Sequence, residues 1–181
     1  MVKLRRLEKS DAPLMLEWMH DPEIQKCFQR DMMGISLMDA EYFCEVFGLK
    51  DKIENGDDMH YAIVDEKNEY LGTISLKNID KVNSTAEYAI SIRKCVQGKG
   101  VAKEATRLVL KKGFGEFGLH RIYLNVLSDN IRGIRFYEKC GFIYEGEFRK
   151  HLKVDGRHKS LKWYAILKGE FDERKFGGGG L

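Results

Sequence analysis

The spacing of apolar residues changes along the chain from a strand period to a helical period and back. Apolar positions three or four residues apart predict helices, and strict alternation predicts strands. The predicted strands cover residues 2–5, 60–65, 70–77, 85–93, 122–127, 143–153 and 158–167. The predicted helices cover residues 11–18, 21–28, 37–52, 100–117 and 130–140. This order predicts an α+β domain over residues 1–170, with seven strands flanked by helices and a flexible tail over 171–181.

The connections between these elements predict how the strands pair. Residues 66–69 join two β-rich runs and are typical of a hairpin, as are residues 154–157 near the C-terminus. These hairpins predict antiparallel pairing. The two strand–helix–strand segments imply that strand direction changes near Arg93. The sheet is therefore expected to be mixed and mostly antiparallel, and a switch in connectivity is a common place for a ligand.

A glycine-rich turn follows the strand predicted over 85–93 and opens the next helix. It reads Gln97-Gly98-Lys99-Gly100-Val101-Ala102. Glycine lets the backbone approach a ligand closely, and the N–H groups of a first helical turn point outward without partners. Lys99 adds positive charge. The turn is predicted to hold a pyrophosphate, and a tight strand-to-helix connection without a ligand is the alternative.

A second glycine-rich segment, Gly113–Gly118, matches the dinucleotide pattern G-x-G-x-x-G. It ends a predicted helix and precedes a strand, which is the reverse of what that mechanism needs, so we interpret it as a loosened helix end. The turn at Gly100 does not fit a nicotinamide dinucleotide either, because Lys103 occupies the position of the third glycine. No G-x-x-x-x-G-K-[ST] sequence is present, which excludes a P-loop.

Asn130 and Tyr137 form a second candidate group at the helix predicted over 130–140. Residues seven apart share a helix face and stand about 10 Å apart along its axis. Two interpretations remain open from the residues alone. Either both side chains face a ligand, or Asn130 caps the helix while Tyr137 packs with its hydroxyl exposed.

These two segments carry a family resemblance. Gln97-x-x-Gly100-x-Ala102, followed by Asn130 and by Phe136-Tyr137-Glu138-Lys139-Cys140-Gly141-Phe142, resembles the GNAT superfamily of acyl-CoA-dependent N-acetyltransferases. Both signature motifs occur in the right order, separated by a helix and a strand. The resemblance covers the chain from Leu4 to about Leu167. It implies a GNAT domain, an acyltransferase activity, acetyl-CoA as co-substrate and no metal.

The resemblance also implies a role for each matching residue. The pyrophosphate of CoA would be held by Gln97, Gly98, Lys99, Gly100, Val101 and Ala102. The strand edge at Ile90 and Ile92 would pair with the pantetheine amides and polarise the thioester carbonyl through a backbone N–H. Asn130 would contact the cofactor arm. Tyr137 would lie beside the sulfur and protonate the departing thiolate.

The attacking amine must be neutral, so a base or a water chain has to take its proton. Glu87, at the start of the strand over 85–93, resembles a carboxylate that several family members use in this way, and a salt-bridged or solvent-facing Glu87 is the alternative. His60 and His120 are weaker candidates, expected at the surface or at strand ends. Direct attack on the thioester needs no enzyme nucleophile, which agrees with the lack of a Cys-His or Ser-His arrangement.

Charge and a second resemblance bear on the acceptor. Residues 1–60 carry 8 Lys/Arg against 13 Asp/Glu, whereas the rest carries 23 against 15. The acidic part favours a cationic amine, and the basic part suits a ligand with several phosphates. Segments 18–23 and 155–157 are similar to the branch with ribosomal-protein-alanine and spermidine N-acetyltransferases. The expected acceptor is a small primary amine, a polyamine or an amino sugar; protein N-terminal acetylation and a non-catalytic CoA-binding module are the alternatives.

The remaining composition excludes several classes of protein. The four cysteines, Cys27, Cys44, Cys95 and Cys140, form no metal or disulfide pattern and are expected to be reduced, packed thiols. No basic helix is interleaved with stacking aromatics, so a nucleic-acid partner is not expected. No apolar run approaches the roughly 20 residues of a membrane-spanning helix, and the N-terminus lacks the apolar core of a signal peptide. A cytoplasmic protein is expected, with a homodimer as a possible assembly.

Overall fold

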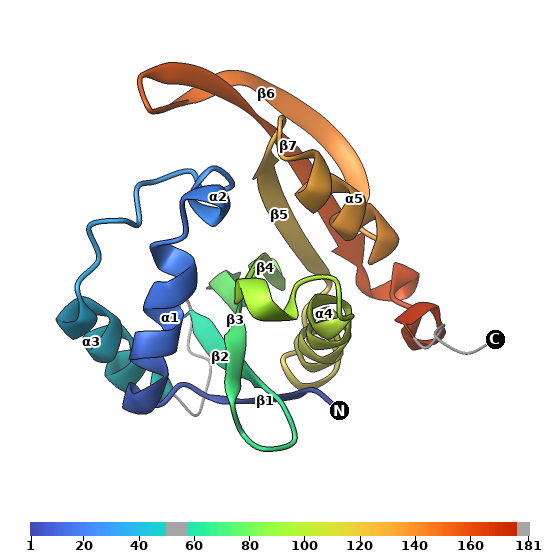
Figure 1. Ribbon diagram of the computed structural model, residues 1–181. Coiled ribbons are helices and arrows are strands. Elements are labelled where there is room, and N and C mark those ends of the chain that lie inside the picture. The colour runs from blue at the N-terminus through green and yellow to red at the C-terminus, as the bar shows by residue number, and fades with distance from the viewer. Residues whose placement is uncertain (50–57, 177–181) are drawn as a thin grey trace.

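The computed structural model describes residues 1–49 and 58–176, and a single sheet of seven strands runs through it in the order β1-β2-β3-β4-β5-β7-β6 (Figure 1). The strands are β1 (Lys3–Arg6), β2 (Met59–Val64), β3 (Tyr70–Asp80), β4 (Thr85–Ile92), β5 (Arg121–Leu127), β6 (Ile143–Val154) and β7 (Arg157–Leu167). The helices are α1 (Ala12–Met19), α2 (Pro22–Gln25), α3 (Leu37–Gly48), α4 (Val101–Lys111) and α5 (Ile131–Lys139).

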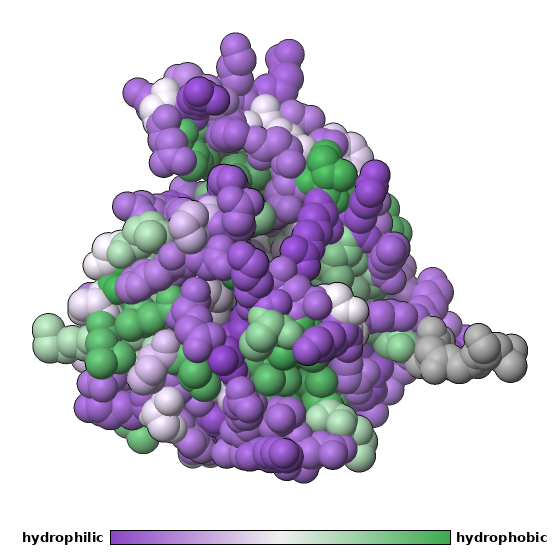
Figure 2. All heavy atoms as spheres, viewed as in Figure 1, coloured by the Kyte–Doolittle hydropathy of each residue, from purple (hydrophilic) through white to green (hydrophobic). Residues whose placement is uncertain are grey.

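The pairing confirms the predicted mixed, mostly antiparallel sheet. Neighbouring strands are antiparallel throughout, except that β4 and β5 are parallel. The parallel pair is the one joined through α4, as a strand–helix–strand connection requires. The β6–β7 hairpin curves away from the rest of the molecule (Figure 1), and its outer end is largely hydrophilic (Figure 2).

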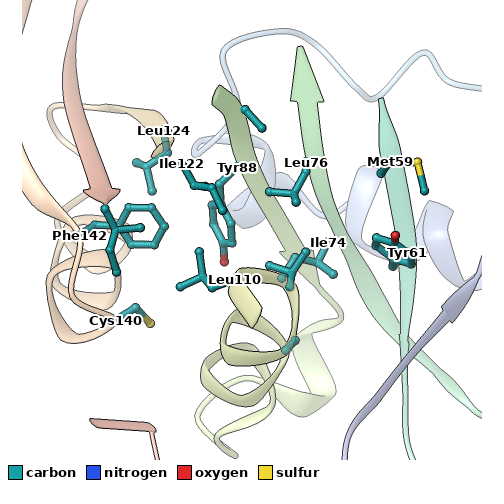
Figure 3. Close-up of a cluster of buried hydrophobic side chains, with 14 of the residues drawn as sticks. Met59, Tyr61, Ile74, Leu76, Tyr88, Leu110, Ile122, Leu124, Cys140 and Phe142 are labelled. Atoms are coloured by element: carbon teal, nitrogen blue, oxygen red, sulfur yellow. The ribbon is translucent and has the colours of Figure 1, made fainter. Parts of the chain in front are cut away.

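Two apolar clusters lie on the two faces of the sheet. One packs α4 and α5 against the central strands and contains fully buried residues such as Ile74, Leu110 and Ile122 (Figure 3). The other packs α1 and α3 against β2 and contains Met15 and Ala62. Burying one such large side chain contributes about 1.5–3 kcal/mol. The predicted strands therefore form a sheet that is covered by α4 and α5 on one face and by α1 and α3 on the other.

Local signals in the sequence set the boundaries of α2 and α4. Asp21 caps α2 by accepting from the N–H groups of Glu23 and Ile24 at 2.8 and 3.2 Å. The end of α4 opens into a π-helical turn over residues 112–116, which confirms the loosened helix end. A Cβ at Gly113 would lie 2.6 Å from Cδ1 of Ile122, so this glycine lets the turn pack closely on β5.

The C-terminal segment differs from the expected flexible tail. Residues 173–176 form a 3-10 turn, and Phe171 and Phe176 pack against the α4 cluster, with the Phe171 ring 5.5 Å from that of Phe114. These aromatic side chains explain why the segment docks. Residues 177–181, and the end of the helix predicted to reach residue 52, lie outside the described residues. No helix in the described ranges is both long and apolar enough to cross a bilayer.

The cysteines divide into two pairs. Cys44 and Cys140 are buried, and burial raises the pKa of Cys140 to about 11. Cys27 and Cys95 are exposed, so the expectation of packed thiols is wrong for these two. Cys27 follows the end of α2 and Cys95 lies in the 3-10 turn Lys94–Val96, and neither short segment has an apolar periodicity that would bury its side chain.

Candidate active site

The strands β4 and β5 pair over only three positions and then part. Thr85, Ala86 and Glu87 pair with Arg121, Ile122 and Tyr123. Beyond Glu87, β4 has no strand partner on this side among the described residues. A sheet that opens at its parallel pair leaves a row of backbone groups available to a ligand.

Which backbone groups face this opening follows from the β3–β4 register. The N–H of Arg93 donates to the carbonyl of Leu71 on β3 at 2.8 Å. Peptide groups alternate in direction along a strand, so the N–H groups of Ile90 and Ile92 point away from β3, toward the opening. Gly72 lies opposite Ile92, and a Cβ there would lie 2.3 Å from the Ser91 carbonyl oxygen. The pairing on the closed side of β4 is therefore tight.

The predicted pyrophosphate turn has the geometry of an anion site. Gly98 and Gly100 have φ of 77° and 79°, a left-handed backbone conformation that favours glycine. Gly100 is the N-cap of α4 and offers no side-chain acceptor, and its carbonyl accepts the first helical bond, from Glu104 N–H, at 3.1 Å. The three N–H groups that precede Glu104 in α4 have no acceptor within the helix. A Cβ at either glycine would meet nothing within 4 Å, so the space above the turn is open.

Arg132 connects the two signature segments, a contact that the sequence reasoning missed. Its Nη1 donates to Oε1 of Gln97 at 2.7 Å. The two residues lie 35 positions apart, and Arg132 follows Asn130 at the start of α5. The contact fixes the start of α5 beside the turn that opens α4 and adds a positive charge near it. In the sequence, the one hint of this contact is that a basic residue, Arg132, stands two positions after Asn130.

Asn130 caps α5, as one of the two open interpretations expected. Its Oδ1 accepts from the N–H of Gly133 at 2.9 Å. A Cβ at residue 133 would lie 2.8 Å from the Asn130 Nδ2, so the glycine makes room for the amide. The cap engages the oxygen, and the Nδ2 donors are not part of it. Capping and a contact with the cofactor arm are therefore compatible.

Tyr137 lies on α5 among aromatic rings. Its ring is 6.0 Å from that of Tyr88, at an interplanar angle of 85°, and 6.1 Å from that of Phe142. The residue is half-buried. Burial raises the pKa of Tyr137 to about 12. The phenol therefore keeps its proton at neutral pH, which a proton donor requires.

Glu87 is salt-bridged, which was the alternative to a free carboxylate. Oε1 accepts from Lys77 Nζ at 3.0 Å, and Oε2 accepts from Asn78 Nδ2 at 2.9 Å. The side chain is 19% exposed. It lies in register with Tyr123 on β5, where the two strands begin to part. The ion pair does not remove Glu87 from the opening, and a base role stays a prediction.

The two histidines occupy structural positions. His60 on β2 shares a hydrogen bond of 2.7 Å between Nδ1 and Ser75 Oγ. Its ring packs edge-on against Phe43 and Phe47, with 4.8 and 4.3 Å between ring centroids, and it is the second residue of β2, which agrees with the expected strand-end position. His120 is exposed immediately before β5.

Aromatic residues line the Glu87 face of the sheet beside the opening. Tyr123 and Asn125 follow Glu87 on this face, Trp163 pairs with Asn125, and the ring centroids of Tyr123 and Trp163 are 6.0 Å apart. Gln29, from the segment after α2, donates a hydrogen bond to Asn125. The buried indole Nε1 of Trp163 has no hydrogen-bond partner within the described part of the chain. The period-two alternation of β5 and β7 could have placed these residues together.

Comparisons with known proteins identify the family of this chain. Residues 2–143 match the family model described as acetyltransferase (GNAT) domain. The spermidine N(1)-acetyltransferase of Vibrio cholerae is 30% identical over 135 residues, which are 74% of this chain and 78% of that protein. A putative ribosomal N-acetyltransferase of Bacillus subtilis is 36% identical over 104 residues, 58% of this chain and 57% of that protein.

The likeness extends to a solved structure. The crystal structure of spermidine N-acetyltransferase from Vibrio cholerae in complex with CoA and spermine has a TM-score of 0.81 and 25% identity, and it covers 93% of this chain and 96% of that one. The family model covers the opening between β4 and β5, the glycine turn and α5. The chain therefore belongs to the GNAT family and is an N-acetyltransferase.

Proposed function

We propose that the protein transfers an acetyl group from acetyl-CoA to a primary amine of a small molecule by direct attack of the amine on the thioester. The observation that carries the proposal is the open edge of β4, with the N–H groups of Ile90 and Ile92 directed into it and the free N–H groups of α4 at one end. An extended chain with amides along it and a pyrophosphate at its end fits these two groups of donors.

Each residue at the opening has a distinct task in this proposal. Acetyl-CoA supplies the acetyl group as an activated thioester. Ile90 and Ile92 bind its amides, and the turn from Gln97 to Ala102 binds its pyrophosphate. Tyr137 holds a proton for the departing sulfur. Burial raises the pKa of the Tyr137 phenol and would also raise that of a thiol in the same site, so the two shifts oppose each other in this proton transfer.

Glu87→Gln is expected to lower kcat/KM by roughly 10²-fold at neutral pH if Glu87 takes the amine proton. The activity should recover partly at high pH, where the amine loses its proton without help. A pH profile of kcat/KM measures both effects. Lys77→Gln is the control, because it removes the ion pair and keeps the carboxylate, and it should retain activity. A Glu87→Gln profile identical to that of the parent would assign the proton to water or to another residue.

A polyamine is the first candidate for the acceptor. The Vibrio cholerae relative is named for its action on spermidine, and residues 1–60 carry an excess of five negative charges. Part of this excess is paired with cations from outside the segment: Oδ2 of Asp21 lies 3.3 Å from Nζ of Lys94, and Oε2 of Glu17 lies 2.7 Å from Nε of Arg93. Local pairing weakens the attraction of a distant cation, so we expect steering of a polyamine to be moderate.

An amino sugar is the second candidate, and the ring pair of Tyr123 and Trp163 favours it. The hydroxyls of a sugar offer both donors and acceptors to the polar groups beside these rings, whereas a protonated polyamine offers only donors. The rings of Tyr123 and Trp163 would pack on the faces of a sugar ring.

One panel of polyamines, amino sugars, peptides and aminoglycoside antibiotics, measured by thiol release at several salt concentrations, tests the acceptor class. Turnover of a polyamine should fall steeply as salt rises, because the screening length shrinks from about 10 Å at 0.1 M to about 3 Å at 1 M. Turnover of an amino sugar should barely respond. Acetylation of peptides alone would contradict a small-molecule acceptor, and binding without turnover across the panel would indicate a CoA-binding module.

Self-association also stays a prediction. A structure of the Vibrio cholerae spermidine N-acetyltransferase is described as dodecameric. We expect this chain to form a homodimer. Analytical ultracentrifugation measures the mass in solution, and a monomeric mass would contradict the expectation.

A further inference from the structure

Tyr88 on β4 is a buried polar residue for which acetyl transfer as described above has no use. It is 2% exposed, and its hydroxyl lies 2.7 Å from Oγ1 of Thr106 on α4. Oγ1 of Thr106 in turn donates to the carbonyl of Ala102 at 2.7 Å. A threonine hydroxyl has one proton, so Tyr88 is the donor in the first bond. The chain of two bonds runs from β4 to the residue that completes the pyrophosphate turn.

The ring of Tyr88 contacts the proposed proton donor on another side. It meets Tyr137 at 85° with 6.0 Å between centroids, and it lies 5.3 Å from Phe142. Figure 3 shows the ring beside Phe142, with the hydroxyl directed toward α4. Leu110 of α4 belongs to the same cluster. Because the hydroxyl bond fixes the tilt of the Tyr88 ring, it also fixes the surface against which Tyr137 packs.

We propose that Tyr88, anchored by Thr106, is a positioning residue that holds the Tyr137 ring where its phenol reaches the sulfur of acetyl-CoA. The second bond, from Thr106 to the carbonyl of Ala102, lies within α4, so it keeps the start of this helix in place whether or not the Tyr88 hydroxyl is present. The inference rests on the proposed function, since it needs Tyr137 as the donor.

Tyr88→Phe tests this with little risk to folding. The ring stays, and Thr106 keeps its bond to Ala102, so no buried donor or acceptor is orphaned. A catalytic group misplaced by about 1 Å can cost a factor of about 10², so we expect kcat to fall by roughly 10- to 100-fold. The KM for acetyl-CoA should change by less than about threefold, because the backbone donors that bind it stay in place.

Tyr70→Phe is the matched control. Tyr70 has the same kind of bond, 2.7 Å between its hydroxyl and Thr73 Oγ1, but in the cluster of α1 and α3 on the other face. Its loss costs at least as much stability, because Trp18 Nε1 also donates to that hydroxyl at 3.0 Å. The kcat of Tyr70→Phe should equal that of the parent. A fall in kcat of equal size in both variants would make the effect of Tyr88 one of general stability and overturn the proposal.

Three further variants complete the test. Thr106→Val should lower kcat as Tyr88→Phe does, Thr106→Ser should restore it, and the double variant Tyr88→Phe/Thr106→Val should be no worse than either single one. The kcat of the double variant Tyr88→Phe/Tyr137→Phe should equal that of Tyr137→Phe alone, because Tyr88 acts through the Tyr137 phenol. An unchanged kcat in Tyr88→Phe, beside a large loss in Tyr137→Phe, refutes the positioning role alone. No loss in Tyr137→Phe refutes the proton donor of the proposed function as well.

Discussion

Replacing Tyr137 by phenylalanine should lower kcat for acetyl transfer by roughly 10²–10⁴-fold, the usual contribution of a general acid. The variant keeps the ring and therefore its contacts with Tyr88 and Phe142. The KM for acetyl-CoA should change little, because the phenol acts on the departing sulfur and not on the bound ground state. Steady-state thiol release at saturating amine measures the effect.

The pKa of Tyr137 sharpens this expectation. Burial raises it to about 12, so the phenol of the parent protein is protonated throughout the neutral range. Its titration should therefore cause no change in kcat with pH in that range. Tyr144→Phe is the control: this ring is 49% exposed on β6, and its contact is with Tyr164. A general acid should contribute at least about 10²-fold to kcat. If the kcat of Tyr137→Phe stays within about twofold of that of the parent, Tyr137 is a packing residue and not the proton donor.

Gly100→Asp should weaken acetyl-CoA binding at least about a hundredfold, which corresponds to roughly 2.7 kcal/mol. The new carboxylate would stand in the open space above the first turn of α4 and repel a pyrophosphate. The φ of 79° adds little to this effect, because aspartate and asparagine both tolerate a left-handed conformation. Calorimetric titration with acetyl-CoA measures the affinity, and circular dichroism checks that the fold persists.

Two controls separate the causes. Gly100→Asn adds similar bulk without charge, and asparagine tolerates the left-handed region, so it should lose much less affinity. Gly115→Asp places the same carboxylate in the other glycine-rich segment, where a Cβ also meets nothing within 4 Å, and it should bind normally. Equal affinities of the parent and Gly100→Asp would move the pyrophosphate site elsewhere.

The sequence predicted what local patterns determine. The seven strands follow from alternation, and the turn at Gly98 and Gly100 follows from glycines placed between a strand and a helix. The same locality explains the double interpretation of Asn130, because an asparagine before a helix can cap it and still offer its amide. Even the loosened end of α4 at Gly113 could be predicted, since glycine weakens a helix wherever it occurs.

Contacts between distant segments could not be predicted in this way. The bond from Arg132 to Gln97 depends on how α5 lies against the start of α4, and the docking of Phe171 on Phe114 depends on the surface that α4 leaves uncovered. The point at which β4 leaves β5 is a property of register and twist, which no single strand encodes. Charge counts share this limit of range, because they do not show that Asp21 has Lys94 as its ion-pair partner.

The three residue pairs that join β4 to β5 have a consequence for the lifetime of the protein. They form a seam between a four-stranded and a three-stranded half of the sheet. A pantetheine arm bonded to Ile90 and Ile92 would act as a removable eighth strand along part of that seam. Since a ligand that binds only the folded state stabilises it by RT ln(1 + [L]/Kd), resistance to unfolding and proteolysis would rise with the concentration of acetyl-CoA.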